Sequence, residues 1–115
     1  MTISCTNRPG HPLFYKLLEQ MADLHARKNQ NYAEAGDPLS NLKGCARIGL
    51  SPLTGVIVRL QDKWSRIEQL VKGQPDLVGE SLEDTLIDSA IYALLAIILL
   101  REAQAEICAP NQFNP

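Results

Sequence analysis

One short stretch of the chain, GVIVRLQDKWSRIEQL at residues 55–70, sets four charged residues among large apolar ones. Arg59, Asp62, Lys63 and Arg66 recur at spacings of three and four, which places them on one face of a helix. Three cations on a narrow stripe can neutralise a phosphate or a carboxylate, and the planar guanidinium of arginine suits both groups. The alternative is a solvated helix face with local ion pairs. The spacing leaves both interpretations open.

Two carboxylates, Asp84 and Asp88, lie four residues apart in a segment that is otherwise largely apolar. A carboxylate in such surroundings is unfavourable unless it is paired or bound to a metal, and a pair one turn apart is a common way for a helical bundle to hold a hard cation. Asp84 has a second interpretation, as the partner of Ser81 in a helix-capping box. Asp88 could instead pair with a basic residue of a neighbouring helix. Tyr92 lies near the same face and is a candidate for contact with a ligand.

A third group of polar residues ends an earlier helical pattern. His25 and Lys28 continue its apolar stripe, and Asn31 and Tyr32 follow in a turn-rich segment. These residues could approach a ligand. The alternative is that His25 is a satisfied structural group and that Asn31 and Tyr32 only cap the loop.

Composition excludes several other classes of protein. Net charge is −2, which argues against binding of bulk nucleic acid through a basic surface. There is no phosphate-binding glycine loop, and the three cysteines (Cys5, Cys45 and Cys108) form no CxxC pair, no zinc motif and no disulfide framework. The most apolar run, residues 90–100, is shorter than the ~20 residues of a membrane span, and no signal-peptide pattern is visible. We therefore expect a cytoplasmic protein with no membrane association.

Helical periodicity runs through the whole chain and predicts an all-α bundle of three long helices with one or two short ones. The first helix begins near Pro12, and the second runs from Ser51 or Pro52 to about Lys72. The third follows Ser81 and continues to about residue 106, and a short helix is expected around residues 39–48. The predicted apolar stripe of the second helix comprises Val56, Ile57, Leu60, Trp64, Ile67 and Val71.

These helices make one predicted domain, residues 11–107, between loosely ordered ends at residues 1–10 and 108–115. The third helix is apolar on all sides from Leu86 to Leu100, which is typical of a central, buried helix. A bundle this small, with so apolar a helix, is expected to complete its core by oligomerisation.

Three motifs together carry a resemblance to a known family. HARKNQNYAEAGDPLSN, GVIVRLQDKWSRIEQL and ESLEDTLIDSAIYALLAI resemble the phage-rich nucleotide-modification-associated domain family (type one), over roughly residues 20–100. That family is similar to the all-α nucleoside triphosphate pyrophosphatases, the MazG-like and dUTPase-like enzymes. The resemblance implies a MazG-like bundle that forms dimers or tetramers, holds Mg²⁺ with carboxylates and splits a nucleotide between its α and β phosphates. For a phage protein it also implies the cytoplasm of a bacterial host.

The resemblance also implies roles for individual residues. Asp84 and Asp88 would be catalytic, and the metal would be held by Glu80, Glu83, Asp84, Asp88 and Asp62. Phosphates and nucleotide would be bound by Lys28, Asn31, Tyr32, Arg59, Lys63, Arg66 and Tyr92. The chain departs from the MazG-like pattern in one respect, because it lacks the E-x-x-E pair. Its first helix offers only Glu19 and Asp23, four residues apart on the predicted solvent side.

Three functions therefore remain open. The first is a Mg²⁺-dependent nucleoside triphosphate pyrophosphatase. The second is a non-catalytic protein that captures a nucleotide, for example a defence signalling nucleotide, and the missing E-x-x-E favours it. The third is a structural dimer with no ligand, whose interior ion pairs only fix the register of the helices.

Overall fold

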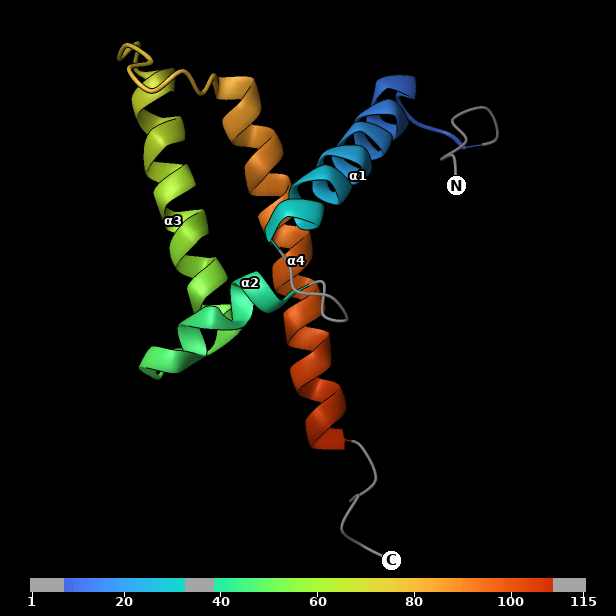
Figure 1. Cartoon of the computed structure of the whole chain (residues 1–115). Helices are drawn as coiled ribbons and strands as arrows, with labels where there is room; N and C mark the ends of the chain where they lie inside the picture. Colours follow the sequence, from blue (N-terminus) through green and yellow to red (C-terminus); the bar gives the residue numbers. More distant parts are fainter. Residues whose placement is uncertain (1–7, 33–38, 109–115) are drawn as a thin grey trace, which may run out of the picture. The chain divides into compact units, whose positions relative to one another are not determined.

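A computed structural model of the chain describes residues 8–32 and 39–108 (Figure 1). The helices are α1 (Pro12–Tyr32), α2 (Ser40–Lys43), the 3₁₀ helix η1 (Gly44–Ile48), α3 (Pro52–Val71) and α4 (Leu82–Cys108). The predicted all-α fold, with three long helices and short ones between the first two, is confirmed. The described ranges contain no strand. They also contain no helix that is long and apolar enough to cross a membrane.

The chain divides into two compact units, residues 1–41 and residues 42–115, which are described separately. In the first unit, α1 begins at Pro12 as predicted, because the proline suits the first helical turn. His11 helps to cap this end, since its Nδ1 accepts a hydrogen bond from the backbone N–H of Leu13 at 3.1 Å. The Tyr15 hydroxyl donates to the carbonyl of Pro9 at 2.6 Å and so fixes the chain that enters the helix. The predicted loose ends lie almost entirely outside the described residues.

In the second unit, α3 and α4 pack side by side and run in opposite directions, joined by residues 72–81 (Figure 1). Local signals set where both helices begin. Ser51 caps α3 by accepting from the N–H of Thr54 at 3.1 Å, directly before Pro52. At α4, the Ser81 hydroxyl accepts from the N–H of Asp84 at 3.1 Å, and the Asp84 carboxylate accepts from the N–H of Ser81 at 3.3 Å. The predicted capping box is therefore confirmed.

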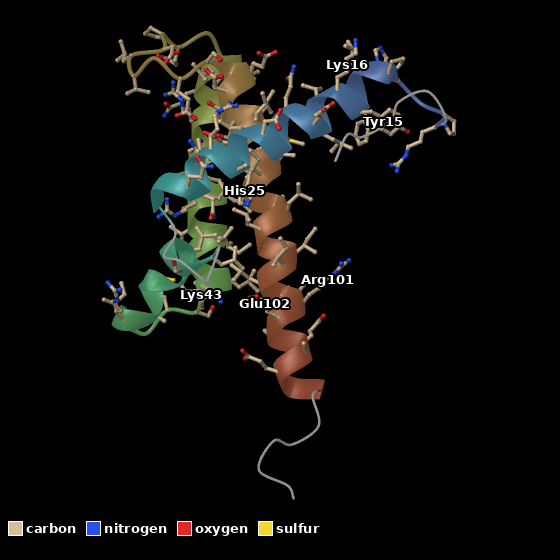
Figure 2. All side chains as sticks on the ribbon, turned by 45° about the vertical axis from the view of Figure 1, so that its right-hand side comes forward. Tyr15, Lys16, His25, Lys43, Arg101 and Glu102 are labelled. Atoms are coloured by element: carbon tan, nitrogen blue, oxygen red, sulfur yellow. The ribbon has the colours of Figure 1, made fainter. Side chains whose placement is uncertain are left out.

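The 3₁₀ helix η1 packs against the start of α3. Gly55 permits this approach, because a Cβ at that position would come within 2.8 Å of Cys45 Sγ. The Cys45 thiol also lies 3.4 Å from the carbonyl of Ser51. An ion pair of 3.6 Å between Lys43 and Glu102, both labelled in Figure 2, joins α2 to the second half of α4.

The buried side of α3 differs from the predicted stripe. Val56 and Ile67 are buried, with exposed fractions of 1% and 8%, but Trp64 and Val71 are 57% and 68% exposed. Ile57 is exposed as well, so this part of the prediction was wrong. The buried residues of α3, Val56 and Ile67, lie beside the basic stripe. The reason is that the basic side chains of α3 contact α4 and the connection before it.

Within the second unit alone, α4 is not buried on all sides. Leu95 and Leu99 are buried, as is Thr85 near the start of the helix. Five large apolar residues of α4 are more than two-fifths exposed, namely Leu86, Leu94, Ile97, Ile98 and Leu100. The reason is that a two-helix hairpin covers only one side of each helix, so α3 leaves the remaining apolar surface of α4 uncovered.

Candidate functional site

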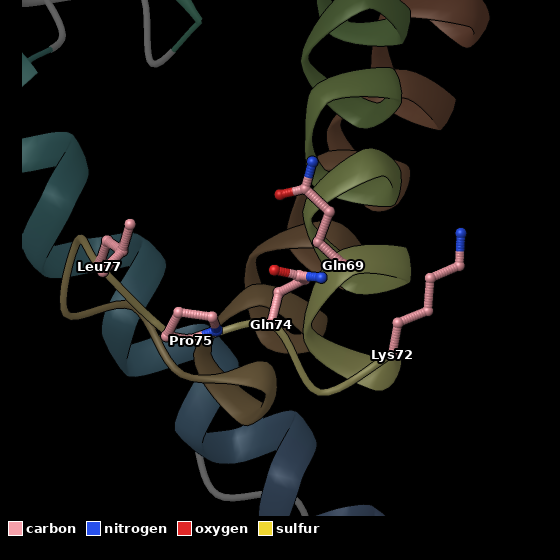
Figure 3. Close-up of a pocket in the computed structure, with 5 residues that line it drawn as sticks. All are labelled: Gln69, Lys72, Gln74, Pro75 and Leu77. Atoms are coloured by element: carbon pink, nitrogen blue, oxygen red, sulfur yellow. The ribbon is translucent and has the colours of Figure 1, made fainter.

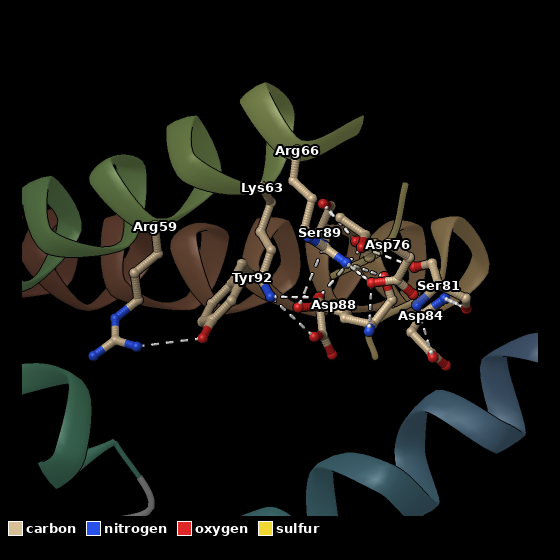
Figure 4. A network of polar contacts seen from close by, with 11 residues as sticks. Arg59, Lys63, Arg66, Asp76, Ser81, Asp84, Asp88, Ser89 and Tyr92 are labelled. Carbon is tan, nitrogen blue, oxygen red and sulfur yellow. Dashed lines mark hydrogen bonds and ion pairs between the residues drawn. The ribbon is translucent and has the colours of Figure 1, made fainter. Parts of the chain in front are cut away.

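The basic stripe of α3 lies against α4 and the connection between the two helices (Figure 4). Arg59, Lys63 and Arg66 follow one another at about one helical turn, so they form a row along the helix. Each makes at least one polar contact with α4 or with residues 72–81. We call this set the cation row. It corresponds to the predicted phosphate-binding residues of α3.

Lys63, in the middle of the row, is held by two carboxylates. Its Nζ lies 2.7 Å from Glu80 Oε1 and 3.2 Å from Asp88 Oδ2. Burial acts to lower the pKa of the Lys63 ammonium, but the hydrogen bonds to Glu80 and Asp88 and the charges of both outweigh it, so the pKa is raised above 10.5. The predicted alternative for Asp88, pairing with a basic residue of the neighbouring helix, is therefore confirmed.

Arg66 ties the end of α3 to the connection that follows it. Its Nη2 donates to Asp76 Oδ1 at 2.5 Å and also to the carbonyl of Glu80. Its Nε is buried and has no hydrogen-bond partner among the described residues, although Glu80 Oε2 lies 3.7 Å away, within ion-pair distance. This guanidinium therefore holds one donor that the surrounding residues do not satisfy.

The contact with Arg66 changes the pKa of Asp76. Partial desolvation acts to raise the pKa of the Asp76 carboxyl, but the hydrogen bond from Arg66 outweighs it, with help from the N–H of Glu80, so the pKa is lowered below 3.8. The sequence analysis did not select Asp76. Its position in the turn before α4, ten residues after Arg66, was the only available signal.

Arg59, at the other end of the row, lies over the ring of Tyr92. Its Cζ is 5.9 Å from the ring centroid, which is within the range of a cation–π contact, and its Nη1 is 3.4 Å from the tyrosine hydroxyl. Arg59 is exposed. The two predicted ligand-binding residues are thus brought together at an open end of the row.

A second layer of hydroxyl groups supports the acidic side of the site. Thr85 is fully buried, and its hydroxyl lies 2.9 Å from the carbonyl of Ser81 and 3.3 Å from Glu80 Oε1. Ser89 donates to the carbonyl of Thr85 at 2.8 Å. Sequence reasoning missed Thr85, although it stands between the two selected carboxylates in EDTLID. It helps to orient the Glu80 carboxylate toward Lys63.

The predicted metal ligands do not meet at one point. Glu80 and Asp88 converge on Lys63, whereas Asp84 caps its own helix. Glu83 and Asp62 are exposed. Within residues 8–32 and 39–108, no group of three or more His, Cys, Asp or Glu side chains is arranged to hold a metal ion. Mg²⁺ is often bound by only one or two protein carboxylates when phosphate oxygens complete its coordination. Glu80 and Asp88 therefore match such a site in the type and number of their ligands.

The remaining predicted ligand residues belong to the first unit. Lys28 lies in the last third of α1 and is exposed. Asn31 and Tyr32 end the same helix, and their side chains lie outside the described part of the structure. Their predicted roles stay predictions.

An open pocket of about 390 Å³ lies beside the end of α3 (Figure 3). Its walls come from the last turns of the helix and from the connection, through Gln69, Lys72, Gln74, Pro75 and Leu77. None of these residues belongs to the cation row or to the predicted site.

Comparisons with protein-family models, with curated proteins and with solved structures found no match to this chain.

Proposed function

We propose that this chain binds the phosphate groups of a nucleotide or nucleotide-derived small molecule through the cation row of α3. The observation that carries the proposal is the row itself. Three long cationic side chains follow one another on one helix side, and Arg66, the last of them before the connection, keeps a buried Nε donor without a hydrogen-bond partner among the described residues. Phosphate oxygens accept charge-assisted hydrogen bonds from guanidinium and ammonium groups, and arginine can offer two parallel bonds to one phosphate.

The row divides naturally into two parts. Lys63 and Arg66 are each about one-fifth exposed and lie among carboxylates, so they suit the charged phosphate end of a ligand. Arg59 is more exposed than Lys63 and Arg66, and with Tyr92 it forms a cation–π pair, which suits the sugar or base. The proposal therefore gives the ligand a direction along α3.

Mg²⁺-dependent hydrolysis of a nucleoside triphosphate to monophosphate and pyrophosphate is the second candidate. The observation that favours it is that Glu80 and Asp88 converge on one cationic atom, Lys63 Nζ. If a metal is bound, these two carboxylates would hold it once the lysine has moved, and the ion would neutralise charge on the phosphates. The lysine and Arg66 would then contact the leaving pyrophosphate.

We also propose that the chain forms a homo-oligomer. The exposed apolar residues of α4 support this proposal, since the exposure of several large apolar side chains on one helix is unfavourable in water. Leu94→Glu is expected to lower the average mass in sedimentation velocity. Glu106→Gln, a change on the exposed last turn of α4, is the control. A wild-type chain that sediments as a monomer at all concentrations would contradict the proposal.

The test of function is a panel of standard and modified nucleoside triphosphates and cyclic signalling nucleotides, each with and without Mg²⁺. Thermal shift reports binding, and product chromatography reports cleavage. Stabilisation by an intact ligand would establish the binder, and Mg²⁺-dependent formation of monophosphate and pyrophosphate would establish the enzyme. If no compound stabilises the chain and none is cleaved, the charges serve only the structure.

A further inference from the structure

The connection between α3 and α4 carries an acidic residue that the proposed function does not explain. Asp76 stands between Gly73 and Gly79, whose positive φ angles of 89° and 74° bend the chain at both sides of it. Its carboxylate is about one-third exposed, yet it is directed at Arg66, whose Nη2 donates to Oδ1. The connection thus places an anion on the last cation of the row, Arg66.

The contact uses only part of what Arg66 offers. A guanidinium pairs best with a carboxylate or phosphate through two parallel N–H bonds. Here Nη2 is shared between Asp76 Oδ1 and the carbonyl of Glu80, and the buried Nε has no hydrogen bond to any described part of the chain. A tetrahedral phosphate with several acceptor oxygens could satisfy both nitrogens, which a single oxygen of Asp76 does not do.

We propose that the Asp76 carboxylate holds, in the ligand-free chain, the position of an anionic group of the ligand, and that binding exchanges Asp76 for that group on Arg66. This inference rests on the proposed phosphate binding by the cation row. The exchange is feasible because a solvent-exposed ion pair contributes little to stability, so a multivalent anion can replace it. The glycines on both sides allow the connection to move when the contact is lost. Asp76 is then an exchangeable counter-ion that limits affinity.

The test is Asp76→Asn, with inorganic pyrophosphate as the probe in calorimetric titrations at low salt. Asparagine keeps an oxygen that can accept from the N–H of Glu80, so the turn is preserved while the negative charge that faces Arg66 is removed. The variant is expected to bind pyrophosphate roughly three- to fivefold more tightly than the wild type. The matched control is Glu68→Gln, which removes the same charge from an exposed residue two positions after Arg66, on the opposite side of α3.

A second measurement follows the connection itself. The N–H of Glu80 donates to Asp76 Oδ1 at 3.1 Å. If pyrophosphate displaces Asp76 from Arg66 in the wild type, this hydrogen bond is lost, so the amide hydrogen of Glu80 should exchange faster with solvent. A purely structural Asp76 would leave the amide unchanged or more protected.

The outcomes separate the two proposals. If the wild type binds and Asp76→Asn binds no more tightly than Glu68→Gln, the exchange is overturned and phosphate binding stands. Binding that is detectable only in Asp76→Asn would support the exchange. If none of the three chains binds pyrophosphate, phosphate binding by the row fails, and the exchange fails with it.

Discussion

The two halves of the α3–α4 hairpin are built differently. The half near the short helices is apolar, with Val56 of α3 and Leu95 and Leu99 of α4 buried there. The half near the connection holds Lys63 and Arg66 among carboxylates, and Ile67 is the buried apolar residue of α3 at that end. Apolar burial stabilises a hairpin directly, whereas partly buried charges must first lose water. The apolar half therefore stabilises the hairpin more directly, and the charged half is the part to which the proposed function assigns the ligand.

The largest expected effect lies in the apolar half. Leu99→Ala should lower the free energy of unfolding by about 2–4 kcal/mol, because it removes a buried side chain and leaves a cavity. Urea denaturation measures the change. Phosphate binding by the remaining folded protein should be unaffected. A loss below ~0.5 kcal/mol would contradict the assignment of this half as the core.

In the charged half, Lys63→Met should cost about 1–2 kcal/mol, because it leaves Glu80 and Asp88 close together without their shared cation. Lys72→Met, which removes an exposed lysine at the end of α3, is the control and should change stability by less than ~0.5 kcal/mol. Equal effects of the two changes would show that the ion pairs do not stabilise the hairpin.

The same pair predicts a pH dependence. The folded-state pKa of Lys63 is raised above 10.5, so its contribution to stability is complete below pH 10.5 and is lost as the pH rises through the folded-state pKa. The difference in unfolding free energy between wild type and Lys63→Met should therefore shrink above about pH 10.5. If this difference in unfolding free energy stays constant in urea titrations up to about pH 11.5, the ionisation of Lys63 is not its source.

Asp88→Asn separates the two candidate functions. It should lower stability by about 1 kcal/mol, because it weakens a charge-assisted hydrogen bond to Lys63. If the chain is a Mg²⁺-dependent enzyme, the same change should abolish turnover in product chromatography. If the chain only binds nucleotides, no Mg²⁺-dependent property should change.

The smallest effect is expected at the open end of the row. Arg59→Gln should lower stability by less than about 1 kcal/mol, since its contact with Tyr92 is exposed. Tyr92→Phe keeps the ring and should have a smaller effect still. If removal of the hydroxyl alone reproduces the whole loss, the 3.4 Å hydrogen bond carries the contact instead of the ring.

Local signals made much of this fold predictable. Pro12 marks the start of α1, Ser51 with Pro52 marks α3, and Ser81 with Asp84 marks α4. Each signal acts within four residues, so no tertiary contact is needed to interpret it.

The rest depends on contacts between elements. The spacing of Arg59, Lys63 and Arg66 predicted a shared helix face, but not that Asp76 would lie on Arg66, since that depends on how the turn before α4 folds. The exposed side of Trp64 was missed for the same reason. The side of α3 that carries Lys63 faces α4, so Val56 and Ile67 are buried and Trp64 is not. The apolar periodicity of one helix does not show where the neighbouring helix lies.

The central claim is that the cation row binds phosphate groups. Its most direct test is calorimetric titration of one nucleoside triphosphate from the panel into wild type, Arg66→Gln and Arg101→Gln. Arg101 is an exposed α4 residue thirteen positions beyond Asp88, or ~20 Å along the helix. We expect Arg66→Gln to weaken binding at least about tenfold and Arg101→Gln to stay within about twofold of wild type. Equal affinities in all three chains, or no binding by the wild type, would contradict the claim.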